Sequence, residues 1–355
     1  MTTIILLNII VILISYIASR YRSPQILKVA FILLSSILSI RYGYGNDYFN
    51  YYDYYIESQK YSFSEVDFEI GWYVLCKLCV PVGYMGFIIL LTCLSQYLIY
   101  RFIKNNVSPK YYWFAVFIYV FQPNLMLLGS SMMRQFFVMA VMLNLFELIL
   151  NKEYLKSIIG LILCFLIHKI AILYIPLLFV GFYDKHLRSG LIFIPIVILF
   201  FIAFYYKDVI TLYAMDLFFS AESDFSNYFL SAEEGRIGIK ETLLYSIIVF
   251  MFLKNFRCLD SKEMSYTLVS LISIVILPFC TLIVMLRRII YMFFIFQIAS
   301  VPMLVNKEKK KYIKIPLMTI YIMITIMDFI NFFQSETYHD AYSTFNTIFS
   351  APNWI

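Results

Sequence analysis

Long apolar runs, separated by short polar segments, follow one another along this sequence. Runs of this kind are typical of transmembrane α-helices, which need roughly 20 predominantly apolar residues to cross a bilayer. About twelve spans are expected, at residues 2–19, 26–40, 83–100, 111–127, 133–150, 157–167, 169–182, 190–206, 241–253, 265–286, 289–305 and 312–333. The pattern predicts an all-α, polytopic integral membrane protein that forms a single domain over residues 1–355.

Two segments depart from this regular pattern. Residues 70–82 contain Pro81 just before the third span, which predicts an interfacial or half-inserted helix. Residues 157–182 are far shorter than the roughly 40 residues that two full spans need. If the segment leaves and re-enters the same side, it forms a short hairpin with His168 and Lys169 near its tip. The alternative is one long span, which would invert every later loop.

Composition supports the membrane assignment. The chain has 62% hydrophobic and only 14% charged residues, with a mean hydropathy of +0.80; soluble domains are about half apolar and about a quarter charged. Its net charge of +6 comes from short clusters between the spans, so a nucleic-acid partner is not expected. The N-terminus has neither a basic start nor a cleavage site and is expected to be a retained span. The six cysteines predict neither a disulfide framework nor a zinc site.

The distribution of charged residues predicts the orientation, because loops on the cytoplasmic side carry an excess of Lys and Arg. Eighteen of the 28 Lys and Arg residues fall in the candidate inner loops 20–28, 101–110, 151–156, 184–188, 254–263 and 306–314. The acid-rich loops 41–69 and 207–241 and the tail 334–355 are then expected on the outer side. This assignment requires the short hairpin at residues 157–182. It also places both termini on the outer side.

Several charged or polar side chains are expected at the outer edge of the membrane, and the four arginines among them break the positive-inside trend. They are Arg41, Asp47, Glu69, Arg134, Gln135, His168, Arg287 and Arg288. Charges at the membrane edge are costly and usually face a cavity or a partner. The planar guanidinium group binds phosphate oxygens at two positions at once. The set therefore predicts an outward-facing site for a pyrophosphate-linked substrate.

Simpler interpretations of these residues stay open. Arg287 and Arg288 would reach lipid headgroups in one alternative, and Arg41 would pair with Asp47 or Asp53 in another. His168 would be a packing residue. The tyrosines of residues 42–55 suit either an interfacial aromatic belt or the binding of sugar rings.

Five segments, in order along the chain, carry a resemblance to the EpsG family, which is similar to Wzy-type O-antigen and exopolysaccharide polymerases. They are RYGYGNDYFNYYDYY from residue 41, EIGWYVL from 69, SSMMRQFFVMAVML from 130, FLIHKIAILYIPL from 165 and RRIIYMFFIF from 287. Two departures are the lysine after His168 and the C-terminal segment FNTIFSAPNWI, which only loosely resembles the family's final segment.

The resemblance implies a glycosyltransferase in the bacterial inner membrane with its active site on the periplasmic side. It would move a glycan from undecaprenyl diphosphate onto a lipid-linked repeat unit. The expected partners are this lipid-linked oligosaccharide and the lipid bilayer, and whether a chain-length regulator binds stays open. No cofactor and no metal are expected.

Roles for the individual residues follow as hypotheses. Arg134, Arg287 and Arg288 would stabilise the diphosphate leaving group electrostatically. Asp47 or His168 would accept the proton of the incoming hydroxyl, with Asp47 preferred. The supporting residues are Arg41, which would orient Asp47 and hold loop 41–69, Gln135 and Glu69, the third candidate carboxylate. Loop 207–241 would select the repeat unit.

Other functional classes remain as alternatives. A lipid-linked sugar flippase or anion exporter also has arginines in a membrane cavity, but such transporters usually contain internal repeats, and none is visible here. An O-antigen ligase-type transferase would use the same donor with a different acceptor. A membrane acyltransferase would need a different arrangement of histidine and carboxylates.

Overall fold

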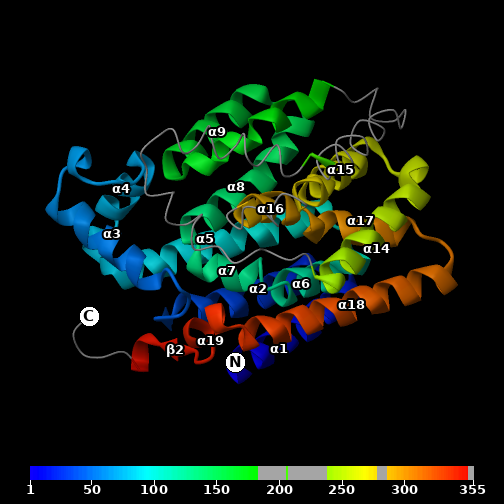
Figure 1. The fold of residues 1–355 in the computed structure, drawn as a ribbon, viewed down its shortest axis with the longest axis horizontal. Helices are drawn as coiled ribbons and strands as arrows, with labels where there is room; N and C mark the ends of the chain where they lie inside the picture. Colours follow the sequence, from blue (N-terminus) through cyan, green and yellow to red (C-terminus); the bar gives the residue numbers. More distant parts are fainter. Residues whose placement is uncertain (183–204, 207–237, 278–285, 351–355) are drawn as a thin grey trace. The chain divides into compact units, whose positions relative to one another are not determined.

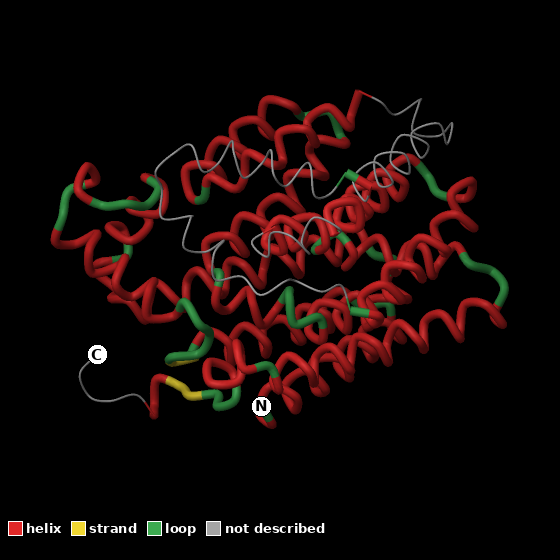
Figure 2. The backbone as a smooth tube through the Cα atoms, viewed as in Figure 1, coloured by secondary structure: helices red, strands yellow, loops and turns green. Residues whose placement is uncertain are grey.

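The computed structural model describes residues 1–182, 205–206, 238–277 and 286–350, and most of them are helical (Figures 1 and 2). The chain divides into two compact units, Met1–Gly181 with Thr325–Ile355, and Phe182–Ile324. The expectation of a single domain stays a prediction. Expected span 190–206 and loop 207–241 lie almost wholly outside the described residues.

The first unit holds most of the candidate site. Its elements are α1 (Thr2–Tyr21), α2 (Pro24–Ser39), β1 (Arg41–Tyr42), α3 (Tyr48–Lys60), α4 (Ile70–Leu78), α5 (Gly83–Asn106), α6 (Tyr112–Phe121), α7 (Met126–Ser131), α8 (Met133–Leu150), α9 (Tyr154–Ile167), the 3-10 helix Lys169–Phe182, the end of α18 (Lys311–Gln334), α19 (Glu336–Tyr342) and β2 (Asn346–Thr347). Helix α1 packs against α2 and α6, α2 against α5, α5 against α8, and α8 against α9.

Local sequence explains how these helices begin and end. Helix α1 ends at Arg22, which has a left-handed backbone conformation with φ of 51°. Helix α2 begins at the N-cap Ser23, whose hydroxyl accepts the N–H of Ile26 at 3.4 Å, and Pro24 occupies the first helical position. Proline is tolerated there because that N–H has no partner within a helix. The tight turn between α1 and α2 therefore follows from the sequence.

Four helices of the described chain are long and apolar enough to cross a membrane: Thr2–Tyr21, Val80–Asn106, Met133–Leu150 and Lys311–Gln334. A fifth candidate is the pair Arg287–Phe294 and Gln297–Lys307, bent by 50°. Shorter apolar helices cover Pro24–Ser39, Tyr154–Ile167 and Lys169–Val180. The protein is thus a helical membrane protein, and the expected count of about twelve spans stays a prediction.

One expected span is broken. Residues 111–127 do not form a continuous helix, because α6 ends at Phe121 and α7 begins at Met126. Pro123 lies between them and has no N–H to continue the helix. Helix α6 is also buried on nearly every side, with Trp113 as its one partly exposed residue. It is therefore a core helix of the first unit rather than a lipid-facing one.

The expected break at His168 is present. Helix α9 ends at Ile167, His168 is extended with φ of −156° and ψ of 119°, and a 3-10 helix follows from Lys169. Whether residues 157–182 leave and re-enter one side of the membrane stays a prediction.

Contacts within each unit join loops that were expected on the same side. In the first unit, β1 pairs with β2 antiparallel, so Arg41 faces Thr347, and loop 41–69 meets the C-terminal tail (Figure 2). The N-terminal amine also donates to the carbonyl of Ser343. These three segments were all predicted to lie outside.

The second unit contains α14 (Ile239–Asn255), α15 (Ser261–Ile276), α16 (Leu286–Phe294), α17 (Gln297–Lys307) and the start of α18. Helix α15 packs against α16 and α17, and α14 packs against α17. Lys254 pairs with Glu308, and Lys307 lies 2.6 Å from Glu263. These ion pairs join the two basic loops 254–263 and 306–314, which were both expected on the inner side.

Candidate functional site

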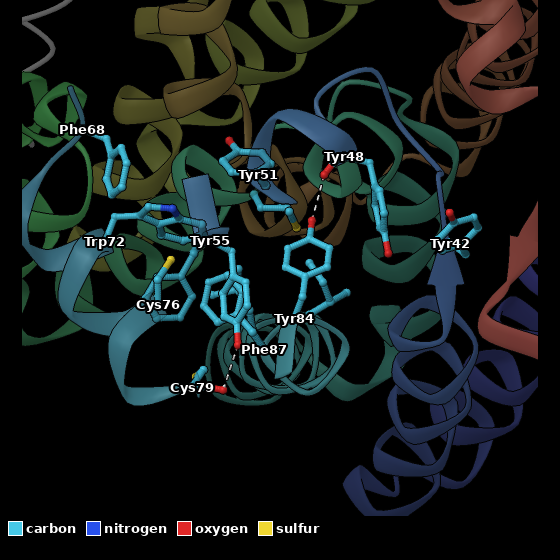
Figure 3. Packing of buried hydrophobic residues seen from close by; sticks show 14 residues of the cluster. Tyr42, Tyr48, Tyr51, Tyr55, Phe68, Trp72, Cys76, Cys79, Tyr84 and Phe87 are labelled. Atoms are coloured by element: carbon cyan, nitrogen blue, oxygen red, sulfur yellow. Dashed lines mark hydrogen bonds between the residues drawn. The ribbon is translucent and has the colours of Figure 1, made fainter. Parts of the chain in front are cut away.

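The tyrosines of α3 form a core rather than a belt. Tyr48, Tyr51 and Tyr55 recur at helical spacing and are 1%, 6% and 4% exposed. They pack against Trp72 of α4 and Tyr84 of α5, and the hydroxyl of Tyr84 donates to the carbonyl of Tyr48 at 2.8 Å (Figure 3). An aromatic belt would present these rings to lipid headgroups. Helix α3, although rich in tyrosine hydroxyls, therefore mainly packs loop 41–69 against the rest of the first unit through buried rings.

Two glycines shape the beginning of this loop. Gly43 and Gly45 have φ of +60° and +107°, backbone conformations that residues with a side chain rarely adopt. A Cβ on Gly45 would also lie 3.0 Å from the Cα of Ser131, so the loop packs directly on the end of α7. Between the glycines, the fully buried ring of Tyr44 contacts Tyr342 edge-on at 5.0 Å. The glycine spacing thus brings loop and C-terminal tail together.

Asp47 is held by Ser131. The N–H of Asp47 donates to the Ser131 hydroxyl at 3.0 Å, and that hydroxyl in turn donates to Asp47 Oδ2 at 3.1 Å. The expectation that Arg41 orients Asp47 is wrong. Arg41 instead donates to the Leu38 carbonyl at 2.8 Å and to Thr92 Oγ1 at 2.7 Å. The left-handed turns at the two glycines separate these two side chains.

Glu69 connects two of the predicted site residues. Its Oε2 lies 2.5 Å from Nη1 of Arg134, and its Oε1 lies 3.1 Å from Nδ1 of His168. Oε1 also accepts the backbone N–H of Lys169 at 3.0 Å. The side chains are partly exposed, with 11% of Glu69, 15% of Arg134 and 24% of His168 accessible. Three segments of the sequence thus meet at one carboxylate.

The charge state of Glu69 follows from these contacts. Burial raises the pKa of its carboxyl, but the hydrogen bond with His168, the charge of Arg134 and the N–H of Lys169 outweigh burial. Together they lower the pKa from the ordinary 4.5 to about 2. Glu69 is therefore ionised at neutral pH, and its charge offsets that of Arg134.

Aromatic rings surround the guanidinium of Arg134. Its central carbon lies 5.2 Å from the ring centroid of Tyr54, 5.9 Å from that of Tyr51 and 6.0 Å from that of Trp72. The Nε of Arg134 and the indole nitrogen of Trp72 are buried without a hydrogen-bond partner. The rings surround the guanidinium as an aromatic cage, and two buried N–H donors beside it have no partner in the described structure.

Gly71 lets α4 approach the end of α9. A Cβ at this position would lie 2.6 Å from the carbonyl oxygen of Leu166. Glu69, two residues earlier, can therefore reach His168, two residues beyond Leu166. The segment Glu69-x-Gly71-Trp72 thus has a structural reason: the carboxylate, the close approach and a wall of the aromatic cage lie within four residues.

The short connection between α7 and α8 gathers three motifs. Ser131 binds Asp47, Met133 Sδ lies 3.1 Å from Nη2 of Arg41, and Arg134 pairs with Glu69. Sequence reasoning missed Ser131, Gly71 and Trp72. Two signals in the sequence would have indicated them: the serine pair before Met132 and the E-x-G-W spacing.

The remaining predicted residues do not contact the carboxylate of Glu69 with their side chains in the described structure. Gln135 is buried behind Arg134 on α8. Arg287 and Arg288 belong to α16 of the second unit, where Arg287 lies 3.9 Å from Glu241. Their assembly with Arg134 stays a prediction. Lys169 uses only its backbone at Glu69 and its side chain is exposed, which accounts for a lysine at this position.

A comparison with known protein families matches residues 25–346, nearly the whole chain, to the EpsG family. The chain belongs to the EpsG family. This family consists of Wzy-like polymerases, and the matched range includes all five segments on which the resemblance rested. No curated protein and no solved structure matches the chain. The EpsG assignment, together with the apolar helices, identifies a membrane protein of a polysaccharide-polymerase type.

Proposed function

We propose that the protein is a polysaccharide polymerase of the bacterial inner membrane that works at the periplasmic face. It would transfer the glycan of an undecaprenyl-diphosphate-linked donor onto a lipid-linked repeat unit. The observation that carries this proposal is the bridge from Glu69 to both Arg134 and His168, because it places an anion-binding group and a proton acceptor around one carboxylate.

His168 suits the role of proton acceptor. An ionised Glu69 accepts a hydrogen bond from Nδ1–H, so the neutral imidazole carries its lone pair on Nε2. Within the described chain Nε2 makes no hydrogen bond, and the side chain is 24% exposed. This geometry favours His168 over Asp47, whose carboxylate is held by the Ser131 hydroxyl. Asp47 would then position loop 41–69.

The proposed step is a displacement at the anomeric carbon of the donor. The acceptor hydroxyl gives its proton to His168 Nε2 while its oxygen forms a bond to the anomeric carbon of the donor. The bond from that carbon to the phosphate oxygen breaks, and its electron pair leaves on the undecaprenyl diphosphate. Arg134 would stabilise this charge with the N–H groups that Glu69 does not occupy.

The test is complementation of a deletion strain, with the surface polysaccharide resolved on a gel. Wild type should restore the ladder, whereas His168→Gln and Arg134→Gln should each leave a single repeat unit, with the protein present in the membrane at normal amount. His339→Gln and Arg101→Gln are the matched controls, because both side chains are exposed and neither contacts Glu69, Arg134 or His168 in the described structure. Both controls should restore the ladder.

The same gel separates the alternatives. If the deletion strain carries no repeat unit at all, the protein acts in flipping or ligation and the polymerase proposal fails. If the deletion yields one repeat unit but His168→Gln and Arg134→Gln both restore the full ladder, the polymerase function holds and the proposed site is wrong.

A further inference from the structure

Arg41 is a buried cation without a counter-charge. The residue is only 2% exposed, and in the described structure its guanidinium donates to neutral groups: the Leu38 carbonyl, Thr92 Oγ1 and Met133 Sδ. Within the described part of the chain no carboxylate lies at ion-pair distance, and Nε has no hydrogen-bond partner. A guanidinium remains protonated at any physiological pH. By contrast, the charge of Arg134 is offset by Glu69.

A small cavity adjoins this side chain. Its volume is about 20 Å³, and its polar lining consists of Arg41, Thr92, Ser95, Gln96 and Ser130. A cavity needs roughly 10–15 Å³, measured in this way, to hold one water molecule. The space thus suits a water or a monatomic anion, and it is too small for a phosphate or a carboxylate group. This excludes the lipid-linked diphosphate as its occupant.

The lining offers donors and no negative charge. Besides Arg41 Nε–H, the amide of Gln96 donates one N–H to Tyr119 at 2.8 Å, which leaves a second. The hydroxyls of Ser95 and Ser130 donate to carbonyls of their own helices, and each would rotate away from its carbonyl to donate to an anion. A water molecule would satisfy Nε–H but would leave the buried positive charge uncompensated.

We propose that this cavity binds a halide ion, chloride under physiological conditions, as the counter-ion of Arg41. The site would join three elements, because Arg41 follows α2, Thr92 and Gln96 belong to α5, and Ser130 is the second-last residue of α7. The ion would hold the start of loop 41–69 against the connection that carries Ser131 and Arg134. This inference rests on Arg41 and its cavity and does not depend on the polymerase reaction.

The test measures thermal unfolding of the purified full-length protein in detergent, with sodium chloride replaced by sodium gluconate at constant ionic strength. Chloride and bromide should raise Tm saturably by on the order of 3 °C, and gluconate should not. Ser130→Val places methyl groups in the cavity while keeping Arg41, and it should abolish the halide response. Ser273→Val, a buried serine of α15 in the second unit, should keep the response.

Three results would overturn the inference. A wild-type Tm that does not depend on halide would assign a water to the cavity. A halide response that survives in both Ser130→Val and Arg41→Gln would place the anion elsewhere. In crystals grown with bromide, an anomalous peak beside Arg41 is expected. Bromide peaks only at other positions would also place the anion elsewhere.

Discussion

Nδ1 of His168 lies 3.1 Å from Oε1 of Glu69, although 99 positions separate the two residues along the chain. This contact explains why a histidine at the end of α9 and a glutamate before α4 belong to one site. The same carboxylate also binds Arg134, so Glu69 contacts two of the predicted site residues, and its role in the reaction stays a prediction.

Glu69→Gln should lower the rate of polymer formation about 10- to 100-fold, as is usual when the partner that orients an active imidazole is lost. The amide can still accept from Nδ1–H, but it carries no charge to offset Arg134. The measurement is the initial rate of polymer formation by purified protein with a lipid-linked repeat unit. Glu336→Gln, at an exposed position of α19, is the control. Equal rates for both variants would rule out the role of Glu69.

Gly71→Ala should destabilise the protein by about 1–3 kcal/mol and reduce activity, because the new methyl group would meet the Leu166 carbonyl and push α4 from α9. Thermal unfolding and the polymer ladder measure the two effects. Gly238→Ala is the matched control, since a Cβ there would meet no atom of the described residues within 4 Å and its φ is −72°. A Gly71→Ala protein as stable and active as this control would contradict the close approach.

Asp47→Asn and His168→Gln together separate the two candidate bases. If Asp47 positions the loop, the asparagine oxygen still accepts from Ser131, and Asp47→Asn should keep much of the activity while His168→Gln loses it. Asp53→Asn, at an exposed position on α3, controls for the loss of a carboxylate there. The opposite outcome, an active His168→Gln and an inactive Asp47→Asn, would make Asp47 the proton acceptor.

Stability should depend on pH through Glu69. Its pKa of about 2 lies below the ordinary 4.5, so the folded state favours the ionised form. The resulting stabilisation is complete above about pH 4.5 and is lost as the pH falls from there toward 2. Unfolding measured across this range should show a smaller loss in Glu69→Gln than in the wild type. Parallel curves for the two proteins would exclude the shift.

The sequence identified the helices best where their signals are local. Expected span 133–150 coincides with α8, and 2–19 with α1 except for two residues at its C-terminal end. A long apolar run and a cap act over a few residues, so they can be read without knowing the fold. The break at His168 was also predicted. The break within span 111–127 was not predicted, because the division at Pro123 and the near-complete burial of α6 depend on the helices packed around them.

By itself, the sequence determined a helical membrane protein of the EpsG family, and it named the residue types and segments of the proposed anion and proton-transfer site. Tertiary structure decided their partners. Arg41 and Asp47 are six positions apart yet do not pair, because the positive-φ turns at Gly43 and Gly45 direct Asp47 to Ser131. Glu69 and His168 are far apart yet meet, because Gly71 lets two helices touch. Such contacts depend on side-chain volume and backbone direction at distant positions, which no local pattern contains.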